Sequence, residues 1–391
     1  MLCAAVTRAR NCNYVGVRLE NAWPVTRTFA YIRNNILIES QAQKCDYLYR
    51  QDQKRGCSIL IAFLRFVLAP LFVLVATSAV HSPLIQAQPL VSEYLGTCDA
   101  SAAVFMGHEQ FVVADDEENS LRVYRLEYPE PVKSYSLDAF AKVDPERPEM
   151  DIEAATIIGS RIYWITSHGA NKNANFRPGR HRFFATDIHF VDGQLSVMPA
   201  GVAYSDLLDD LARAPQLQKY RLDEAAHIAP KDAGGLNIEG LADTTTGAFL
   251  LGFRNPTPGG KALIVTIENP SDVIHGKKPT IGLVAELSLG GNGIRSMERN
   301  GDHYLIVAGS SGEGSNFHLF RWQGPEHTAI PVLVPAVDFE DLHPEALFVS
   351  SKGRVYVLSD DGRRKINDVD CKNLPVEKRR FRAKVIKPYA E

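Results

Sequence analysis

The strongest constraint on the fold of this chain is an internal repeat, whose clearest copy spans residues 234–256 and reads GGLNIEGLADTTTGAFLLGFRNP. This copy contains a glycine turn, an acid-bearing strand at 237–242, a polar turn at 243–247 and an apolar strand at 248–253. Reduced copies occur four more times along the chain. Such a repeat is typical of a modular architecture, in which each unit buries its apolar surface against its neighbours.

Each copy opens a unit of short strands with alternating apolar residues. The openings begin at residues 99, 151, 237, 293 and 343, and the widest interval lies between the second and the third. The last unit has only three clear strands, but the segment 90–96 (LVSEYLG) supplies a fourth. A ring of four-stranded units that is closed from both ends is typical of a β-propeller. We therefore predict an all-β propeller of five four-stranded blades, with six blades as the alternative.

The wide interval is expected to hold a helical insertion at 199–235. Ser205 is expected to cap an amphipathic helix, and Pro215 to stop it. The apolar stripe of that helix consists of Leu207, Leu208 and Leu211. Insertions in repeat proteins lie in loops, which often border the binding face. We expect 199–235 to form a lid or rim within a single domain at 89–391.

The first 88 residues are basic, with ten Lys and Arg against four Asp and Glu, in a chain whose net charge is -3. An apolar run at 58–80 follows Lys54 and Arg55 and has the pattern of a secretory signal. We expect 58–88 to be a signal peptide for export to the periplasm or the cell exterior, or else a retained membrane anchor, because about 20 apolar residues can span a bilayer. Residues 1–57 show no clear periodicity, and they either precede the true start of the protein or form a disordered leader.

Only two of the six cysteines, Cys98 and Cys371, follow the signal segment. In an exported chain such a pair is expected to form a disulfide, which here would staple the closure of the ring. The alternatives are two buried free thiols or a cytosolic protein.

The first strand of each propeller blade lines the central channel, and its side chains alternate. Aligning the five openings places one residue of each at the same position, namely Ser101, Glu153, Glu239, Arg295 and Glu345. Two residues earlier, on the same face, stand Asp99, Asp151, Asn237, Gly293 and His343. Carboxylates placed close together need a cation, an arginine or raised pKa values.

We expect Glu153, Glu239 and Glu345 to hold a divalent cation or to seat a polar substrate on the axis. Calcium is the candidate ion, because hard oxygen ligands dominate. The alternative is structural, since acids in such a repeat can accept hydrogen bonds from neighbouring blades.

A second set of polar residues follows the second strand of each unit, in turns that are expected to lie on one rim. Those suited to an anionic or phosphorylated ligand are Asp116, His168, Lys172, Arg254 and Asp361. His168 would act there as a general acid or base. Alternatively these are solvated turn residues, as charged residues in turns usually are. A basic stretch at 172–182 favours a solvated loop over nucleic-acid binding, because residues 89–391 carry a net charge of -9.

The motifs DASAAV, DIEAA with YWITSHGANK, NIEGLAD with GFRNP, GIRSME, HPEALFV and LSDDG together resemble the bacterial family called domain of unknown function 3616. The resemblance covers the chain from about Thr97 onward. It implies an exported propeller-like domain, more remotely similar to the esterase-like phytase group. It implies no established activity and no catalytic residues.

Three functions are consistent with these residues, since propellers serve all of them. The first is the binding of a small polar or anionic ligand, with or without a divalent cation, on the channel face where the axial acids and the rim loops meet. The second is a phytase-like, metal-assisted hydrolysis of phosphoesters, and the third is a non-catalytic periplasmic interaction module. We expect no nucleic-acid partner, and membrane contact only through an uncleaved signal.

Overall fold

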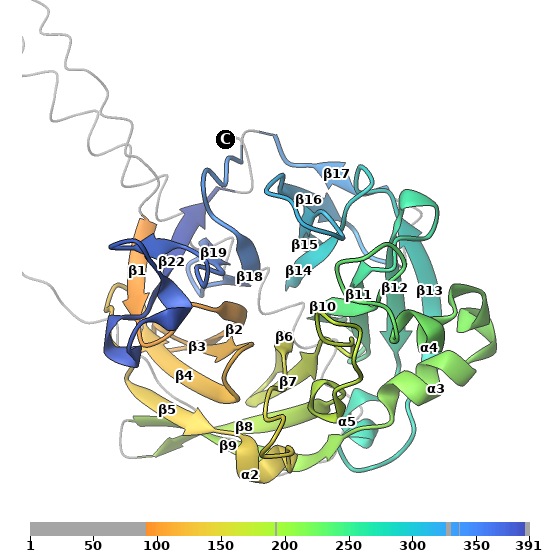
Figure 1. The fold of residues 1–391 in the computed structure, drawn as a ribbon, viewed down its shortest axis with the longest axis horizontal. Coiled ribbons are helices and arrows are strands. Elements are labelled where there is room, and N and C mark those ends of the chain that lie inside the picture. Colours follow the sequence, from red (N-terminus) through yellow and green to blue (C-terminus); the bar gives the residue numbers. More distant parts are fainter. Residues whose placement is uncertain (1–90, 192–193, 326–329, 336, 388–391) are drawn as a thin grey trace, which may run out of the picture. The chain divides into compact units, whose positions relative to one another are not determined.

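The computed structural model describes residues 91–387 except 192–193, 326–329 and 336. Five four-stranded antiparallel sheets are arranged in a ring as the blades of a β-propeller (Figure 1). This confirms the predicted all-β fold with five blades. The expected leader at 1–57 and the expected signal or anchor at 58–88 lie outside the described residues. Among the helices that the structure describes, none has the length and apolarity to cross a membrane.

The first four blades follow one another along the chain, each built by successive antiparallel neighbours. Blade one consists of β2 (Ala100–Gly107), β3 (Gln110–Asp115), β4 (Ser120–Arg125) and β5 (Lys133–Ser136). Blade two consists of β6 (Ile152–Ile158), β7 (Arg161–Thr166), β8 (Phe183–Val191) and β9 (Gln194–Tyr204). Blade three consists of β10 (Asn237–Asp243), β11 (Phe249–Asn255), β12 (Ala262–Ile267) and β13 (Ile281–Leu287). Blade four consists of β14 (Gly293–Asn300), β15 (His303–Gly309), β16 (His318–Trp322) and the short β17 (Val332–Leu333).

The fifth blade closes the ring with strands from both ends of the described chain. From the axis outward its strands are β18 (Pro344–Val349), β19 (Val355–Ser359), β22 (Arg380–Ile386) and β1 (Val91–Leu95). β1 pairs with β22 in an antiparallel register that places Val91 opposite Lys384. This confirms the predicted use of the segment before the first unit as a strand of the last blade. A small ribbon of β20 (Lys365–Ile366) and β21 (Val369–Asp370) lies in the loop between β19 and β22.

A disulfide and an aromatic cluster hold this closure. Cys98 and Cys371, both fully buried, are bonded across a sequence separation of 273 residues, as predicted. The Tyr94 ring of β1 packs against Phe111, Tyr124 and Phe381 at centroid distances of 5.1, 5.4 and 5.3 Å. The last strand of the sheet is therefore fixed by side-chain packing as well as by its backbone ladder.

The hydrophobic core lies between the faces of neighbouring blades, where the apolar side of each sheet meets the next one. At the contact between blades three and four, Gly240 of β10 pairs with Gly252 of β11. A Cβ atom on Gly252 would stand 2.9 Å from the Cγ2 atom of Ile294 in β14. The repeat unit seen at 234–256 therefore uses two glycines to admit an isoleucine from the next blade.

The insertion after blade two differs in part from the expectation. β9 runs on to Tyr204, so that residues 199–204 belong to the sheet. Helix α3 (Leu207–Arg213) buries Leu207, Leu208 and Leu211 as predicted. The cap predicted for Ser205 is wrong, because the residue before the helix is Asp206 and the Ser205 hydroxyl donates to the Asp206 carboxylate instead, at 2.9 Å.

Helices lie mainly at the outer edge of the ring. The insertion also contains α4 (Leu222–Ala225), and two further short helices are α2 (Asp138–Ala141) and α5 (Pro270–Val273). In Figure 1, α3 and α4 lie beside the outer strands of blade three. Lys219 accordingly pairs with Glu286 of β13 at 3.0 Å. Only the segment after α4 reaches the residues around the channel, as described below.

Candidate functional site

Each innermost strand contains a β-bulge near its start. In β10, Ile238 pairs with Phe253 and Gly240 pairs with Gly252, which leaves Glu239 as the extra residue. The same skip in β2, β6, β14 and β18 leaves Ser101, Glu153, Arg295 and Glu345 as extra residues. A bulge redirects the side chain of its extra residue and bends the strand. The five residues that alignment assigned to the channel are thus the five bulged residues, one per blade.

These five side chains are all buried, with exposed fractions between 0% and 9%. Ser101 has the simplest role. Its hydroxyl donates to the carbonyl of Ile152 at 2.5 Å and so joins the first strands of blades one and two. This contact fits the structural alternative for the ring, in which channel residues bond to neighbouring blades.

Arg295 of blade four links the carboxylates on its two sides. Its Nη1 atom lies 3.0 Å from Oε2 of Glu239 in blade three, and its Nη2 atom pairs with Glu345 of blade five. Glu239 also pairs with Arg254 at 2.9 Å and accepts a hydrogen bond from Asn237 at 2.6 Å. Burial, and then the neighbouring Arg254, lower the pKa of Arg295. Two of the predicted channel acids are therefore compensated by arginine.

Glu153 is in a different environment from Glu239 and Glu345. No hydrogen bond or ion pair from the described residues reaches its carboxylate. Burial raises the pKa of Glu153 well above its ordinary value, and the neighbouring Glu239 and Asp151 raise it further, while Arg295 and Arg254 act in the opposite direction. Glu153 is thus a buried acid without a direct counter-ion.

Three more carboxyl groups gather near Glu153, and we call the four together the acidic cluster: Asp99, Asp116, Glu153 and Asp360. The Oδ1 atom of Asp116 is buried and has no hydrogen-bond partner. Burial, followed by Asp360, Asp99 and Glu153, raises the pKa of Asp116 well above its usual range. Burial and the adjacent Asp360 raise the pKa of Asp99 to about 8.

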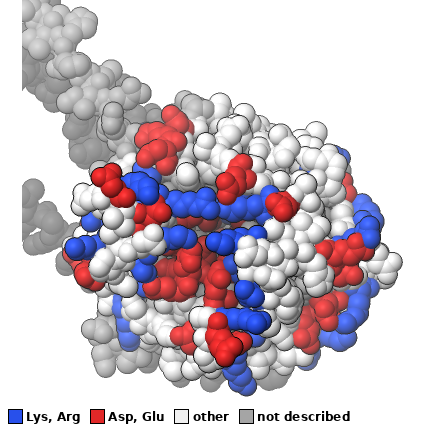
Figure 2. Space-filling model, viewed as in Figure 1, with Lys and Arg blue, Asp and Glu red and all other residues white. Residues whose placement is uncertain are grey.

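Basic side chains stand on the other side of the axis from the acidic cluster. These basic residues are Arg254, Arg295 and Lys231, and Lys231 belongs to the segment after α4. Burial lowers the pKa of Lys231, and the neighbouring Arg254 and Arg363 lower it further. Lys231 pairs with Glu313 at 3.6 Å. Figure 2 shows acidic side chains gathered in the middle of this face, with Lys and Arg side chains beside them. The mouth of the channel is therefore divided into an acidic and a basic side.

The predicted rim residues Asp361 and Lys172 have opposite environments. Asp361 is 2% exposed and accepts hydrogen bonds from Arg382 at 2.8 Å and from Ser359 at 2.8 Å. It anchors the end of β19 to β22. Lys172 is exposed on the loop after β7 and makes no hydrogen bond or ion pair with a described residue.

His168, the predicted general acid or base, is fully buried instead of exposed on a rim turn. Its Nδ1 atom lies 2.8 Å from the carbonyl of Thr166, and its buried Nε2 atom has no partner. Burial lowers the pKa of His168 to about 4, which keeps the ring neutral at pH 7. No carboxylate among the described residues forms an ion pair with it. Its catalytic role stays a prediction.

The described residues contain no group of three or more His, Cys, Asp or Glu side chains that is arranged to hold a metal ion. Two of the three expected calcium ligands, Glu239 and Glu345, are paired with Arg295. The calcium role of Glu153, Glu239 and Glu345 stays a prediction.

The sequence predicted the five channel positions, but it predicted neither the β-bulges nor the position of Lys231 near Arg254. A signal for the bulges was present, because the residue after each channel residue is small in every unit: Ala102, Ala154, Gly240, Ser296 and Ala346. Lys231 offered no signal, since its approach to Arg254 depends on how the insertion folds back.

The ring and its buried axial charges define a five-bladed β-propeller with a polar channel mouth. The family model described as "Protein of unknown function (DUF3616)" matches residues 196–343, which confirms the family resemblance over that part of the chain. A search of curated proteins finds no match to this chain.

Solved propeller-like structures show only a distant likeness. Glutaminyl cyclase from Myxococcus xanthus is 12% identical, with 76% of this chain and 96% of that chain covered and a TM-score of 0.39. A putative oxidoreductase (glucose dehydrogenase) from Thermus thermophilus is 11% identical, with 76% and 100% covered and a TM-score of 0.39. The calcium-binding protein regucalcin from Agrobacterium tumefaciens is 10% identical, with 74% and 92% covered and a TM-score of 0.33. At these values the likeness says nothing about the activity of this chain.

Proposed function

We propose that this protein binds a small polar ligand at the mouth of its channel and that the acidic cluster takes a positively charged part of that ligand. The observation that carries the proposal is the imbalance between the two sides of the mouth. Glu239 and Glu345 are matched by arginines, whereas the buried Oδ1 atom of Asp116 and the carboxylate of Glu153 have no partner within the described residues. Burial, and then repulsion from the neighbouring carboxylates, raises the pKa values of Asp116 and Glu153, and a cation would oppose both effects.

A protonated amine fits this site better than a bare anion does. An anion would have to compete with Glu239 and Glu345 for Arg254 and Arg295, because both arginines already bind those carboxylates. An anionic ligand therefore needs an accompanying cation, such as a divalent metal ion or an amine on the same molecule. The expected ligand is therefore a polar molecule that carries a positive charge or binds together with a cation.

The binding experiment compares putrescine, calcium chloride and inorganic phosphate as probes, with thermal stabilisation and calorimetry as readouts. We expect a cationic probe to bind the wild-type protein at pH 8 and to bind Asp116→Asn and Glu153→Gln at least tenfold more weakly. Asp223→Asn is the matched control, because Asp223 is exposed on α4 and makes no described contact with the channel. Equal binding of the cation by all variants would refute the proposal.

The phosphoester-hydrolase hypothesis has less support. His168 is buried and neutral at pH 7, and no described group of three ligands is arranged for a metal. A channel that binds without catalysis should show saturable binding and no turnover of p-nitrophenyl phosphate. Turnover that disappears in His168→Ala would favour the hydrolase.

We also propose that the protein is exported, which is the location where a disulfide is expected to persist. The bond between Cys98 and Cys371 supports this proposal. A C-terminal epitope tag and cell fractionation test it. Recovery of the tagged chain in the periplasm or the medium is expected, and recovery in the cytoplasm alone would contradict it.

A further inference from the structure

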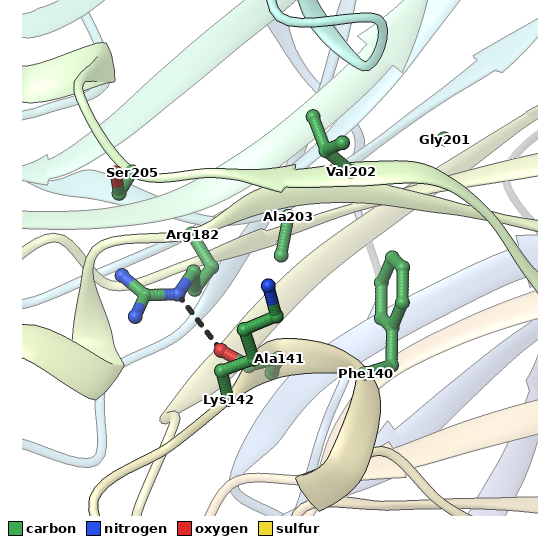
Figure 3. Close-up of a pocket in the computed structure, with 8 residues that line it drawn as sticks. All are labelled: Phe140, Ala141, Lys142, Arg182, Gly201, Val202, Ala203 and Ser205. Carbon is green, nitrogen blue, oxygen red and sulfur yellow. Dashed lines mark hydrogen bonds between the residues drawn. The ribbon is translucent and has the colours of Figure 1, made fainter.

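A second concave site lies at the outer edge of the propeller, away from the channel. It is a pocket of about 350 Å³ between α2, at the end of blade one, and β9, the outermost strand of blade two (Figure 3). Its walls include Phe140, Lys142, Arg182, Val202 and Ser205. The volume falls within the range of roughly 300 to 1,000 Å³ that is usual for small-molecule sites.

Arg182 forms one wall of the pocket and is held there by backbone carbonyls. Its Nη1 atom donates to the carbonyls of Pro178 and His181 at 2.8 Å each, and its Nε atom donates to that of Ala141 at 3.5 Å. Its Nη2 atom makes no hydrogen bond with a described residue. The guanidinium group is therefore fixed in place with its Nη2 amino group unused.

Lys142 brings a second positive charge to the same pocket. It ends α2 in a left-handed conformation, with φ of 51°. In Figure 3 its ammonium group points into the space between Arg182 and Phe140. Within the described part of the chain, neither Lys142 nor Arg182 has a carboxylate within ion-pair distance. Burial lowers the pKa of Arg182, and the Asp206 carboxylate acts in the opposite direction. The same carboxylate accepts a hydrogen bond from the Ser205 hydroxyl.

The opposite part of the pocket is apolar. The Phe140 ring and the Ala203 methyl group line it, while the Val202 side chain points to the other side of β9 (Figure 3). Phe140 and Ala203 are both only partly buried, so apolar surface stands open beside the two cations. Burying that surface would add favourable free energy to the charge attraction.

We propose that this pocket binds a small organic anion, a phosphate monoester or carboxylate with a compact apolar body. The acid group lies between Lys142 and Arg182, because the Nη2 amino group of Arg182 and the Lys142 ammonium group can each donate to one oxygen atom of the same acid. The apolar body lies against Phe140 and Ala203. This site is separate from the channel mouth, and it does not depend on the function proposed there.

The test uses phenyl phosphate as the probe, in calorimetric titrations at pH 7 and low salt. We expect Lys142→Met to bind it about tenfold more weakly than wild type, while Lys261→Met binds it equally well. Lys142 and Lys261 are both exposed, and so neither substitution is expected to disturb the core. Phe140→Ala should weaken phenyl phosphate but leave the weaker binding of inorganic phosphate unchanged.

Other outcomes would overturn the proposal. If phenyl phosphate fails to bind the wild-type protein, the pocket is not a site for this class of ligand. If Lys142→Met and Lys261→Met weaken binding equally, the protein attracts anions by its general charge. If inorganic phosphate binds as tightly as phenyl phosphate, the apolar wall has no part in recognition. Thermal unfolding of each variant shows whether a loss of binding comes from a loss of fold.

Discussion

The axial ion network should respond strongly to the loss of Arg295. Arg295 is 5% exposed and pairs with Glu239 and Glu345. Removing one partner of a buried ion pair costs about 3–5 kcal/mol, because the remaining charge stays buried without compensation. Glu239 would keep its contacts with Arg254 and Asn237, so most of the lost stabilisation would come from the unpaired Glu345. We therefore expect Arg295→Met to lower the free energy of unfolding by about 3 kcal/mol at pH 8.

The assay is urea unfolding followed by tryptophan fluorescence. The loss should be smaller at pH 5, because a proton can then neutralise the unpaired Glu345. Adding Glu345→Gln to Arg295→Met should recover much of the loss at pH 8, since the amide carries no charge. A loss below about 1 kcal/mol, or no recovery in the double variant, would refute the view that Arg295 compensates these acids.

Three further predictions concern the closure, the blade contact and the mouth. The bond between Cys98 and Cys371 can be broken by reduction or by the double substitution Cys98→Ser and Cys371→Ser. Its loss should lower the free energy of unfolding in urea by about 3–5 kcal/mol, because a long loop is no longer closed in the unfolded chain. Equal stability with and without reductant would contradict this. Gly252→Ala should cost about 1–3 kcal/mol, measured by thermal unfolding, because its Cβ atom would meet Ile294 at 2.9 Å; an unchanged melting temperature would show that the blades can move apart freely. The folded-state pKa of Asp99, raised to about 8, makes a contribution to stability that is fully present below the unfolded-state value near 4 and is lost as the pH rises through 8. Asp99→Asn should thus flatten the decline in stability between about pH 4 and pH 8, and an equally steep decline in the variant would be evidence against this assignment.

The repeated two-strand pattern was enough to predict the five blades and the closing strand, because strand alternation and turn residues are local properties of the sequence. Alignment of the openings also found the five channel positions. It did not predict how these positions differ. Glu239 is paired with arginines and Glu153 is not, and this difference depends on where Arg254 and Arg295 lie in the folded protein. Such partners depend on neighbouring blades, which a single repeat does not contain.

The rim residues show the same limit. Asp361 lies in an ordinary Asp-Asp-Gly turn by sequence, but the return of β22 brings Arg382 against it. His168 follows its strand as a turn residue does, but the loop from Asn171 to Arg180 folds back over it, and the His168 amide donates to the carbonyl of Arg180 at 2.9 Å. The outer pocket also depends on tertiary structure, because the first three strands of blade two lie between α2 and β9 in the sequence.

The pairing of β1 with β22 has a consequence for how the protein is made. β1 emerges from the ribosome before every other strand of the ring, but its partner β22 emerges after all of them. Until then its backbone groups and the ring of Tyr94 lack their neighbours in blade five, and the chain carries an unpaired strand edge. The ring can therefore be completed only after β22 has been synthesised, and a chain cut off before Arg380 would lack β22 and leave β1 without its partner.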